Sequence, residues 1–418
     1  MRLASNRSMT PQAHEAPHRT EVLVVGSGPT GLSLACRLAQ RDIDHVIVDQ
    51  AAQGANTSRA AVIHARTLEA LESLGAADAL VAGGLAVPRF KCRERNRTLL
   101  ELDFAELHTK YPYALMLPQN RTEALLEQRL EASGSHVMRP LALTALKQQP
   151  DRVTATLASE GAAPQPIDAA YVVGCDGMHS LVREAIDVPF IGWQYQQAFI
   201  LADVRLDWSL PRDEVDLFLS EHGLLVVAPL PGDQHRVVAT VDRADPIPST
   251  EAVRELFALR GPESPPALVR DVVSSARFYV HHRLAEHYRS GRVFLAGDAA
   301  HVHSPAGGQG MNAGIQDAIV LADTLADSLR GSLDPKVLDR YEDERKPVAR
   351  SILKMTGVMT ATATLRGQVP RKLRNELLAL MGHVPAIRRS FARQLSATAE
   401  KTPRRDRLKA IQLLSPSP

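Results

Sequence analysis

The sequence predicts an α/β protein, α+β overall, that combines a Rossmann-like dinucleotide-binding domain, a mostly antiparallel sheet domain and C-terminal helices. Three observations support this fold class. Val22 to Val25 is an unbroken apolar run that leads into a glycine-rich turn and an apolar helix. Between Phe190 and Tyr279 short apolar strands separated by turn residues replace that pattern. From Ile315 onward the apolar residues recur at helical spacing.

The first glycine-rich turn, residues 26–31, reads GSGPTG and lies between a strand and a helix. A second predicted strand, His45 to Val48, ends in Asp49. Strand, glycine turn, helix, strand and an acid about 20 residues further on form the dinucleotide-binding fingerprint, in which the acid binds a ribose hydroxyl. The fingerprint does not separate NAD from FAD. The expected contacts with the nucleotide are Gly26, Gly28, Pro29, Gly31 and Asp49.

Composition excludes several classes of function. The chain has 49 basic and 47 acidic residues among 418, a balance that gives no reason to expect nucleic acid or an anionic membrane as a partner. Cys36, Cys92 and Cys175 have no paired or metal-type spacing, so packing roles, no metal site and a reducing cytoplasm are expected. Residues 1–20 lack an apolar signal core and are expected to be a disordered leader.

Two segments after the fingerprint could reach a bound nucleotide. A helix is expected from Ser58 to Leu74, and Arg59 at its start could contact a pyrophosphate or be an ordinary surface arginine. Gln119 lies near the start of another expected helix, where its amide could bond a ribityl chain or a ring edge.

The stretch from Arg292 to Asp317 predicts a seat for a ring system that becomes negatively charged. Its apolar strand ends in Gly297-Asp298, so the acid is well placed to bind a ligand hydroxyl. The loop from Ser304 to Gly310 contains three glycines, which allow the backbone to approach a ligand closely. A helix begins near Met311-Asn312, and its free N–H groups favour an anionic ligand.

A second acid at a strand end repeats this arrangement. Asp176 follows an apolar strand and precedes a short helix that contains Ser180 and Arg183. These residues alone leave two interpretations open: a ligand contact, or a local turn or ion pair with Arg183.

Together these motifs resemble the three signatures of the single-component (class A) FAD-dependent aromatic hydroxylases, which have the para-hydroxybenzoate hydroxylase fold. The first is the 26–31 turn, the second contains Gly177, Ser180 and Arg183, and the third is GDAAH at 297–301 with the loop and helix start that follow. GGQGMN at 307–312 and ARTLE at 65–69 resemble the phenol hydroxylase and polyketide hydroxylase branch. The similarity spans about Glu21 to Arg350, and the thioredoxin-like C-terminal domain of many relatives is not expected in this chain.

The resemblance implies tightly bound, non-covalent FAD, with NADPH or NADH as a transient co-substrate. Asp49 would bind the adenosine ribose and Asp298 the ribityl chain. Pro305, with the glycines after it, would line the space in which a flavin C4a-hydroperoxide forms. The other residues expected to contact FAD, some of them also close to the nicotinamide, are Gly297, Arg59, Gln119, Asp176, Arg183, Gly308, Gly310, Met311 and Asn312.

The sheet domain should decide the substrate. The para-hydroxybenzoate enzyme uses a strand tyrosine and a nearby arginine to hold its substrate, but residues 215–227 contain no tyrosine and residues 226–230 no arginine. A phenolic or polycyclic aromatic substrate is therefore expected. Pro305 is one catalytic candidate. The candidate catalytic bases are His222, Tyr195 and His235, although each alone is more often a surface or packing residue.

The main expectation is NAD(P)H- and O2-dependent hydroxylation by a monomer or homodimer. Baeyer–Villiger-type or antibiotic-inactivating oxygenation, a non-oxygenating FAD oxidoreductase and a non-catalytic FAD-binding protein remain alternatives. The expected order along the chain is a leader (1–20), the FAD-binding domain in three parts (21–84, 114–188 and 284–330), a substrate-domain excursion (85–113), a substrate-binding sheet (189–283), C-terminal helices (331–400) and a tail (401–418).

Overall fold

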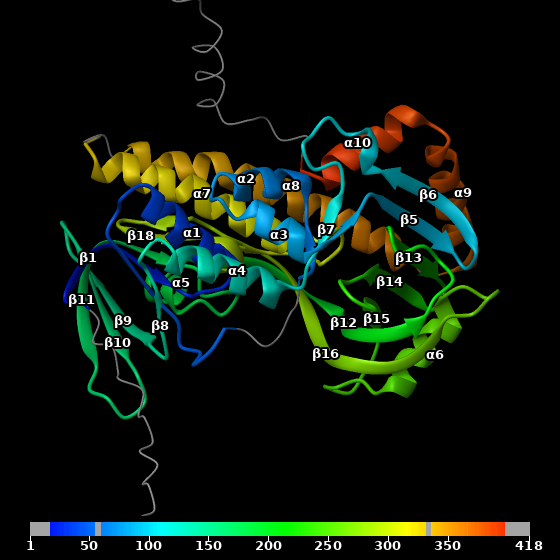
Figure 1. Cartoon of the computed structure of the whole chain (residues 1–418), viewed down its shortest axis with the longest axis horizontal. Coiled ribbons are helices and arrows are strands. Elements are labelled where there is room, and N and C mark those ends of the chain that lie inside the picture. The colour runs from blue at the N-terminus through cyan, green and yellow to red at the C-terminus, as the bar shows by residue number, and fades with distance from the viewer. Residues whose placement is uncertain (1–16, 55–59, 332–335, 366, 398–418) are drawn as a thin grey trace, which may run out of the picture.

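The computed structural model describes residues 17–54, 60–331, 336–365 and 367–397. Figure 1 shows two β-rich lobes, with two long helices along one side of the molecule. Those helices are α7 (Gly310–Leu329) and α8 (Lys336–Ala363), and α8 extends from the first lobe toward the second. Within the described ranges, no helix is both long and apolar enough to cross a membrane.

The first lobe is built on an eight-stranded sheet in the order β17-β18-β11-β1-β2-β8, with β10 and β9 continuing from β11. The strands next to β1 run parallel to it, as does β18 beside β11 and β8 beside β2. The strands are β1 (Arg19–Val25), β2 (His45–Val48), β8 (Val137–Met138), β9 (Ala142–Gln148), β10 (Val153–Ala158), β11 (Gln165–Gly174), β17 (Arg289–Ser290) and β18 (Val293–Leu295).

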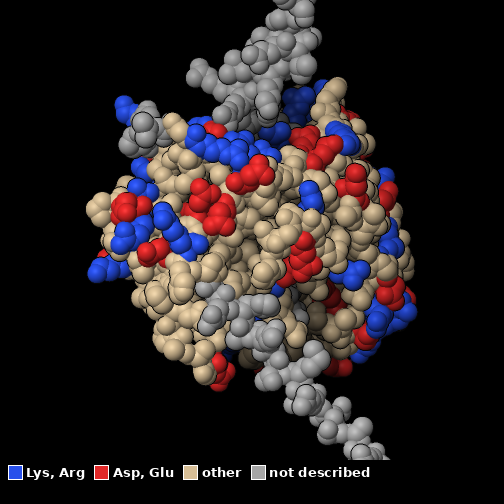
Figure 2. Space-filling model, turned by 60° about the vertical axis from the view of Figure 1, so that its left-hand side comes forward, with Lys and Arg blue, Asp and Glu red and all other residues tan. Residues whose placement is uncertain are grey.

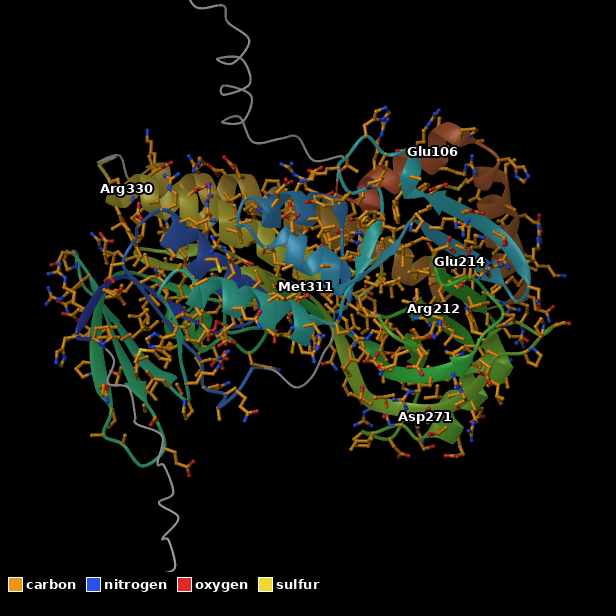
Figure 3. The ribbon with its side chains drawn as sticks, viewed as in Figure 1. Glu106, Arg212, Glu214, Asp271, Met311 and Arg330 are labelled. Atoms are coloured by element: carbon orange, nitrogen blue, oxygen red, sulfur yellow. The ribbon has the colours of Figure 1, made fainter. Side chains whose placement is uncertain are left out.

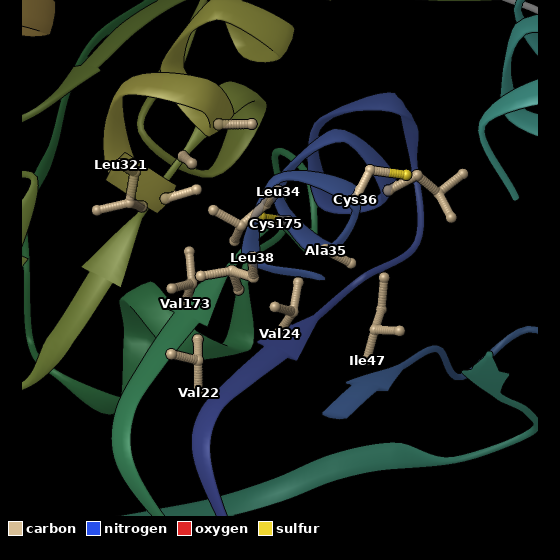
Figure 4. Close-up of a cluster of buried hydrophobic side chains, with 14 of the residues drawn as sticks. Val22, Val24, Leu34, Ala35, Cys36, Leu38, Ile47, Val173, Cys175 and Leu321 are labelled. Carbon is tan, nitrogen blue, oxygen red and sulfur yellow. The ribbon is translucent and has the colours of Figure 1, made fainter. Parts of the chain in front are cut away.

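Helix α1 (Pro29–Gln40) packs its apolar residues on this sheet. Leu34 and Leu38 of α1 contact the core that includes Val22 and Val24 of β1 and Val173 of β11 (Figure 4), and all five side chains are fully buried. Burial of each such side chain contributes roughly 1.5–3 kcal/mol. The apolar run of β1 is thus explained by helix α1, which covers one face of the sheet. The packing of α1 on β1 also fixes the glycine turn between them.

The second lobe contains another eight-stranded sheet, in the order β19-β16-β12-β15-β14-β13-β5-β6. Its pairs are antiparallel except β13 with β5. The two longest strands, β12 and β16, have 18 residues each and lead from the first lobe into the second. The strands are β5 (Arg89–Glu94), β6 (Arg97–Asp103), β12 (Phe190–Asp207), β13 (Glu214–Ser220), β14 (Gly223–Pro229), β15 (Gln234–Val241), β16 (Leu268–Ala285) and β19 (His301–Val302).

Shorter elements complete the chain. A small sheet joins β3 (Val62–Ile63), β7 (Ala114–Met116) and β4 (Leu85–Val87). Phe257 of helix α6 (Thr250–Arg260) packs on the second sheet. The last two helices lie against β6. The remaining helices are α2 (Ala65–Glu72), α3 (Ala77–Gly83), α4 (Gln119–Glu131), α5 (Leu181–Ala185), α6 (Thr250–Arg260), α9 (Gln368–Gly382) and α10 (Pro385–Leu395).

The helix expected from Ser58 to Leu74 is wrong in its first part. Val62 and Ile63 form strand β3, paired with β7, and the helix begins only at Ala65. The physical reason is that two β-branched residues gain ladder hydrogen bonds and burial beside β7, which outweighs the helical spacing that follows. Arg59 lies outside the described residues, as do residues 1–16 of the expected leader, residues 398–400 of the expected C-terminal helices and the expected tail (401–418), whereas β1 already begins at Arg19.

Candidate functional site

The glycine turn between β1 and α1 has one packed side and one open side. At Gly31 a Cβ would collide with the Gly26 carbonyl, and Gly26 itself has a positive φ of 100°. At Gly28, by contrast, a Cβ would meet nothing within 4 Å. Helix α1 begins with Pro29 at its first turn, and no side chain caps it. Free N–H groups facing open space make this turn a cradle for an anion such as a diphosphate.

Asp49 is fixed beside that cradle. Its Oδ2 accepts hydrogen bonds from the Ser27 N–H and the Ser27 hydroxyl, both at 2.7 Å, and its Oδ1 accepts from the Ala51 N–H at 2.8 Å. Arg139 donates to the Ser27 hydroxyl at 2.7 Å and so helps to hold the side chain that binds Asp49. A carboxylate has about four acceptor positions, so these three bonds leave room for a ribose hydroxyl.

Asp298 lies in a single 3-10 turn, Gly297–Ala299, that follows β18. It is exposed although both neighbours, Gly297 and Ala299, are buried. Gly297 has a φ of 61°, and a Cβ there would lie 2.6 Å from the hydroxyl of Thr30 in the fingerprint turn. A Cβ at Gly314 of α7 would collide with the same hydroxyl. Thr30 therefore fills the space left by both glycines, and this packing holds the fingerprint turn, the end of β18 and helix α7 together.

The start of α7 is held by the side chain of Asn312. Its amide donates to the carbonyls of Val62 at 2.8 Å and Gly308 at 2.7 Å, and its oxygen accepts from the N–H of His64 at 2.8 Å. The side chain is buried, so it holds three backbone segments and is not directed at a ligand. Met311, on the same helical turn, lies between the two lobes (Figure 3). No side-chain cap closes the first turn of α7, whose N–H groups can face a ligand.

Two histidines bond to carbonyl groups of the loop before α7. His64 donates from Nε2 to the Gly307 carbonyl at 2.7 Å, and His303 from Nδ1 to the Ser304 carbonyl at 3.0 Å. Burial lowers the pKa of each ring to about 4, so both are neutral at pH 7. In both histidines the other ring nitrogen is buried and has no hydrogen-bond partner among the described residues.

His301 belongs to a buried ionic network. Its Nε2 donates to one oxygen of Asp317 at 2.6 Å, and the guanidinium of Arg345 donates to the other at 2.6 Å. Burial opposes ionisation of Asp317, but Arg345 and His301 outweigh it and hold the pKa of that carboxyl below its usual range. The network ties β19, which begins at the last residue of the GDAAH motif, to α7 and α8, so it supports the site structurally.

The buried neutral histidines predict how stability depends on pH. His64, His235 and His303 have pKa values lowered to about 4, mainly by burial, and regain a value near 6.5 on unfolding. Between these values the unfolded chain binds more protons than the folded chain. Urea denaturation of the apoprotein should therefore give a free energy of unfolding that changes little between about pH 7 and 8 and falls from about pH 6.5 toward pH 4. A flat profile in that range would contradict these assignments.

Asp176 matches the local-turn interpretation in part. Its Oδ2 accepts from the Val182 N–H at 3.1 Å, at the start of α5, and burial raises its pKa. Arg183 donates to the carbonyls of Ala299 and Met178, at 3.0 and 2.8 Å, and stacks on Phe190. No ion pair between Asp176 and Arg183 occurs among the described residues. Oδ1 of Asp176 is buried and has no hydrogen-bond partner in the described part of the chain, so one acceptor remains for a ligand.

Gln119 is occupied within the protein. Its Oε1 accepts from the Ala60 N–H at 3.1 Å, its own N–H donates to the Ala60 carbonyl at 3.0 Å, and its Nε2 donates to Glu123 at 2.9 Å. The residue that the resemblance connects with FAD therefore holds the segment next to Arg59. Any contact of Gln119 with a ligand would have to be made beside these bonds.

Arg236 holds the same carbonyl from the other lobe, although no sequence motif pointed to this residue. Its guanidinium donates to the Ala60 carbonyl at 2.8 Å and pairs with Asp203 through two hydrogen bonds of 2.8 Å. The sequence signal for this pair is an acid, Asp203, inside the apolar run of β12 and a base, Arg236, inside that of β15. Ala60 is thus held by Gln119 of the first lobe and Arg236 of the second.

The candidate bases lie in different surroundings. Tyr195 lines a cavity of about 720 Å³, and His222 lines a second one of about 650 Å³. Both cavities include Gln197 and Asp242, so they are neighbours. His235 lines neither. It is buried beside Trp208 and Arg212, which favours a packing role. Pro305 is exposed at the surface of the loop.

Comparisons with known proteins agree with this arrangement. The family model described as "FAD binding domain" matches residues 19–356. The chain is 41% identical to the 6-methylpretetramide 4-monooxygenase of Streptomyces rimosus, over 84% of this chain and 63% of that protein. It is 35% identical to the 12-dehydrotetracycline 5-monooxygenase/anhydrotetracycline 6-monooxygenase of the same species, over 92% of this chain and 78% of that one. It thus spans just under two thirds of the length of the first relative.

A solved structure has the same fold. The OxyS anhydrotetracycline hydroxylase from Streptomyces rimosus superposes with a TM-score of 0.76 at 34% identity, over 92% of this chain and 77% of that chain. The expectations of a class A flavoprotein, of its fold and of FAD are confirmed by these matches. The chain therefore belongs to the FAD-binding family of class A, flavin-dependent monooxygenases that includes enzymes acting on aromatic and polyketide compounds.

Proposed function

We propose that this chain, loaded with FAD, uses NAD(P)H and O2 to hydroxylate a neutral phenolic or fused polycyclic aromatic compound. The observation that carries the proposal is the junction at Thr30, where the open glycine turn, exposed Asp298 and the uncapped start of α7 come together. Open backbone at Gly28 and the acceptor atoms left on Asp49 and Asp176 fit a dinucleotide with sugar hydroxyls.

Each group of residues has a physical role in that proposal. Bound FAD supplies hydride acceptance and oxygen activation, chemistry that side chains lack. The turn around Gly28 holds the diphosphate, Asp49 the adenosine ribose and Asp298 the ribityl hydroxyls. The first N–H groups of α7 stabilise negative charge on the ring edge that faces them. Asn312 and Arg236 keep the backbone of these segments in place.

The substrate class is proposed from the second lobe. The strand tyrosine and arginine that would bind a benzoate are missing, and two neighbouring cavities of about 720 and 650 Å³ adjoin β12. Both volumes lie in the range of about 300–1,000 Å³ that is usual for pockets of drug-sized ligands. A single aromatic ring would fill only part of either cavity. The named substrates of the tetracycline-related relatives support a fused-ring compound.

NAD(P)H is proposed as a transient co-substrate. Within the described ranges there is only the strand, glycine turn and helix at β1 and α1 to serve as a nucleotide fingerprint, and that one is assigned to FAD. Acidic and basic side chains are interspersed on the face shown in Figure 2. This face therefore has no large positive patch that would attract the phosphates of NAD(P)H.

The direct test measures aerobic oxidation of NADPH and NADH by the FAD-loaded protein with a panel of phenols and polycyclic aromatics. Oxidation stimulated by an aromatic compound, together with a product heavier by one oxygen atom, is the expected result. Flavin reduction without stimulation by any member of the panel would favour a non-oxygenating oxidoreductase. Failure of the purified protein to bind FAD would overturn the proposal at its first step.

A pair of glycine variants separates ligand binding from folding. Gly28→Ala is expected to leave the free energy of unfolding within about 1 kcal/mol of the wild type, because its Cβ meets no protein atom. The same methyl would intrude on the diphosphate, so FAD affinity should fall on the order of 100-fold, or about 2.7 kcal/mol. Isothermal titration of the apoprotein with FAD measures this.

Gly31→Ala is the comparison variant, because its Cβ collides with the Gly26 carbonyl inside the protein. It is expected to destabilise the apoprotein by roughly 1–3 kcal/mol through overpacking. Unchanged FAD affinity in Gly28→Ala would contradict the placement of the diphosphate.

A further inference from the structure

Arg260, the last residue of α6, is a buried cation without a counter-ion. It is 5% exposed. Its Nη1 donates to the backbone carbonyls of Leu224 at 2.8 Å and Thr240 at 2.7 Å. In the described part of the chain the guanidinium has no carboxylate partner, and its Nε is buried without any hydrogen-bond acceptor. A charge taken out of water in this way is unfavourable unless another group compensates it.

Other arginines that are buried to a similar degree show how the protein usually meets this cost. Arg93, Arg236 and Arg345 each pair with a carboxylate. Arg183 and Arg374 are also buried and form no such pair among the described residues, but neither lines one of the two cavities of the second lobe. Arg260 combines both properties, because it lacks a carboxylate and lines the cavity of about 650 Å³.

The start of β14 leaves room for this guanidinium. Gly223 has a positive φ of 113°, and a Cβ there would lie 2.5 Å from the Thr240 hydroxyl and 3.4 Å from Nη1 of Arg260. Gly223 lines the same cavity. Nη2 of Arg260 makes no hydrogen bond to any described residue, so its N–H groups are available to a molecule held in the cavity.

The charges around the cavity indicate which acceptor fits. Burial lowers the pKa of Arg260 to about 10 and Asp242 acts in the opposite direction, so the guanidinium is charged at pH 7 and is a strong donor. A carboxylate or phosphate would meet a surplus of negative charge, whereas a neutral carbonyl oxygen would not. The charged residues of the lining are Glu221, Asp242, Asp245, Glu255, Arg243 and Arg260.

The cavity is also close to the loop assigned to the flavin. Thr360 of α8 donates its hydroxyl to the Ser304 hydroxyl at 2.6 Å. Thr364 lines the cavity, and its N–H donates to the Thr360 carbonyl at 3.0 Å. Four residues of helix correspond to about 6 Å along the axis. A molecule of several fused rings is therefore long enough to lie near this loop and also enter the cavity.

We propose that Arg260 binds a carbonyl oxygen of the substrate, on a ring other than the one that is hydroxylated. The residue thereby selects fused-ring ketones and quinones over aromatic compounds that have the same outline but no carbonyl group. This inference rests on the proposed function, because it assigns the cavity to the substrate of the same reaction.

The test is equilibrium dialysis of the oxidised, FAD-loaded enzyme with 2-hydroxyanthraquinone and 2-hydroxyanthracene, at a pH below the pKa of either hydroxyl group. The two probes share one ring outline and differ by two carbonyl oxygens. The wild type is expected to bind the quinone roughly 10- to 100-fold more tightly, because hydrogen bonds to charged donors are strong. Arg260→Gln should lose this preference through weaker quinone binding, while its affinity for 2-hydroxyanthracene stays within about threefold of the wild type.

Arg254→Gln is the matched control on the same helix. Arg254 also donates to two backbone carbonyls, those of Val269 at 2.9 Å and Arg270 at 3.0 Å, but it is exposed and does not line the cavity. The control removes the same charge and the same number of carbonyl bonds. It should therefore keep the wild-type preference for the quinone.

A second variant tests the cavity without changing Arg260, and it is informative even if Arg260→Gln does not fold. Ala252 lines the cavity and is half-buried. Ala252→Trp should fill part of the cavity and weaken quinone binding roughly 10-fold or more, with wild-type resistance to urea. The quinone should also act as a substrate or as a competitive inhibitor of whichever panel compound is turned over.

The inference is overturned if the wild type binds both probes equally, if Arg260→Gln keeps the preference, or if Ala252→Trp binds the quinone as the wild type does. Non-competitive inhibition by the quinone would also overturn it, because the quinone would then occupy a site separate from the substrate. A wild type that hydroxylates aromatic compounds but gives any of these results leaves the proposed function standing. The proposed function fails only if no aromatic compound stimulates product formation by the wild type.

Discussion

Replacing Asn312 with alanine is expected to lower the free energy of unfolding by about 3–5 kcal/mol and to weaken FAD binding. The change removes three hydrogen bonds to backbone groups of Val62, His64 and Gly308. Each buried group left without its partner costs roughly 1–3 kcal/mol. Because these bonds join β3 to the start of α7, their loss also loosens the N–H groups assigned to the flavin ring.

Urea denaturation of the apoprotein and flavin fluorescence during FAD titration measure the two effects of this change. Asn120→Ala is the matched control, because Asn120 is exposed and, among the described residues, its side chain accepts only a local bond from the Arg121 N–H. That control should change stability by less than about 0.5 kcal/mol. Wild-type stability in Asn312→Ala would show that the asparagine does not hold these segments.

Replacing Asp317 with asparagine is expected to cost about 3–5 kcal/mol of folding free energy. The substitution keeps the shape but removes the charge that pairs with Arg345 and His301 in the interior. Removing one partner of a buried ion pair leaves the other charge poorly compensated. The control is Asp323→Asn on the same helix, where the carboxylate pairs with Arg37 at 3.0 Å but is 24% exposed. That change should cost at most about 1 kcal/mol.

The same variant has a signature at low pH. The folded pKa of Asp317 is below its unfolded value, so its contribution is present above about pH 3.9 and is lost as pH falls through the folded value. Asp317→Asn should therefore show a flatter decline of stability below pH 4 than the wild type. Equal destabilisation by Asp317→Asn and Asp323→Asn would show that burial does not set the strength of these pairs.

The nucleotide-binding half could be predicted from sequence because its signals are local. The fingerprint turn, its flanking strands and the Asp298 strand end are each defined by residues close together in the chain. Two of the three glycines of that turn, Gly26 and Gly31, are required by packing, because a Cβ at either position would collide with a backbone carbonyl. Sequence could not distinguish Gly28, which faces open space, from Gly31, which faces Gly26.

The second lobe was harder to predict, since its order depends on pairing between distant residues. Strand β16 has 18 residues but includes Ser274, Ser275 and Arg277, which obscure its alternation. It is specified by its long pairing with β12, and that pairing also creates the bulge at Tyr195. The role of Gln119 was equally hard to predict, because its hydrogen-bond partner Ala60 lies 59 positions earlier in the sequence.

The most direct test of the central claim is a turnover of the FAD-loaded enzyme under ¹⁸O2 with NADPH or NADH and an aromatic compound that stimulates oxidation. The product is expected to contain one ¹⁸O atom, while the second oxygen atom appears in water. A product without ¹⁸O, or complete conversion of the consumed oxygen to hydrogen peroxide with every stimulating compound, would contradict the assignment as a monooxygenase.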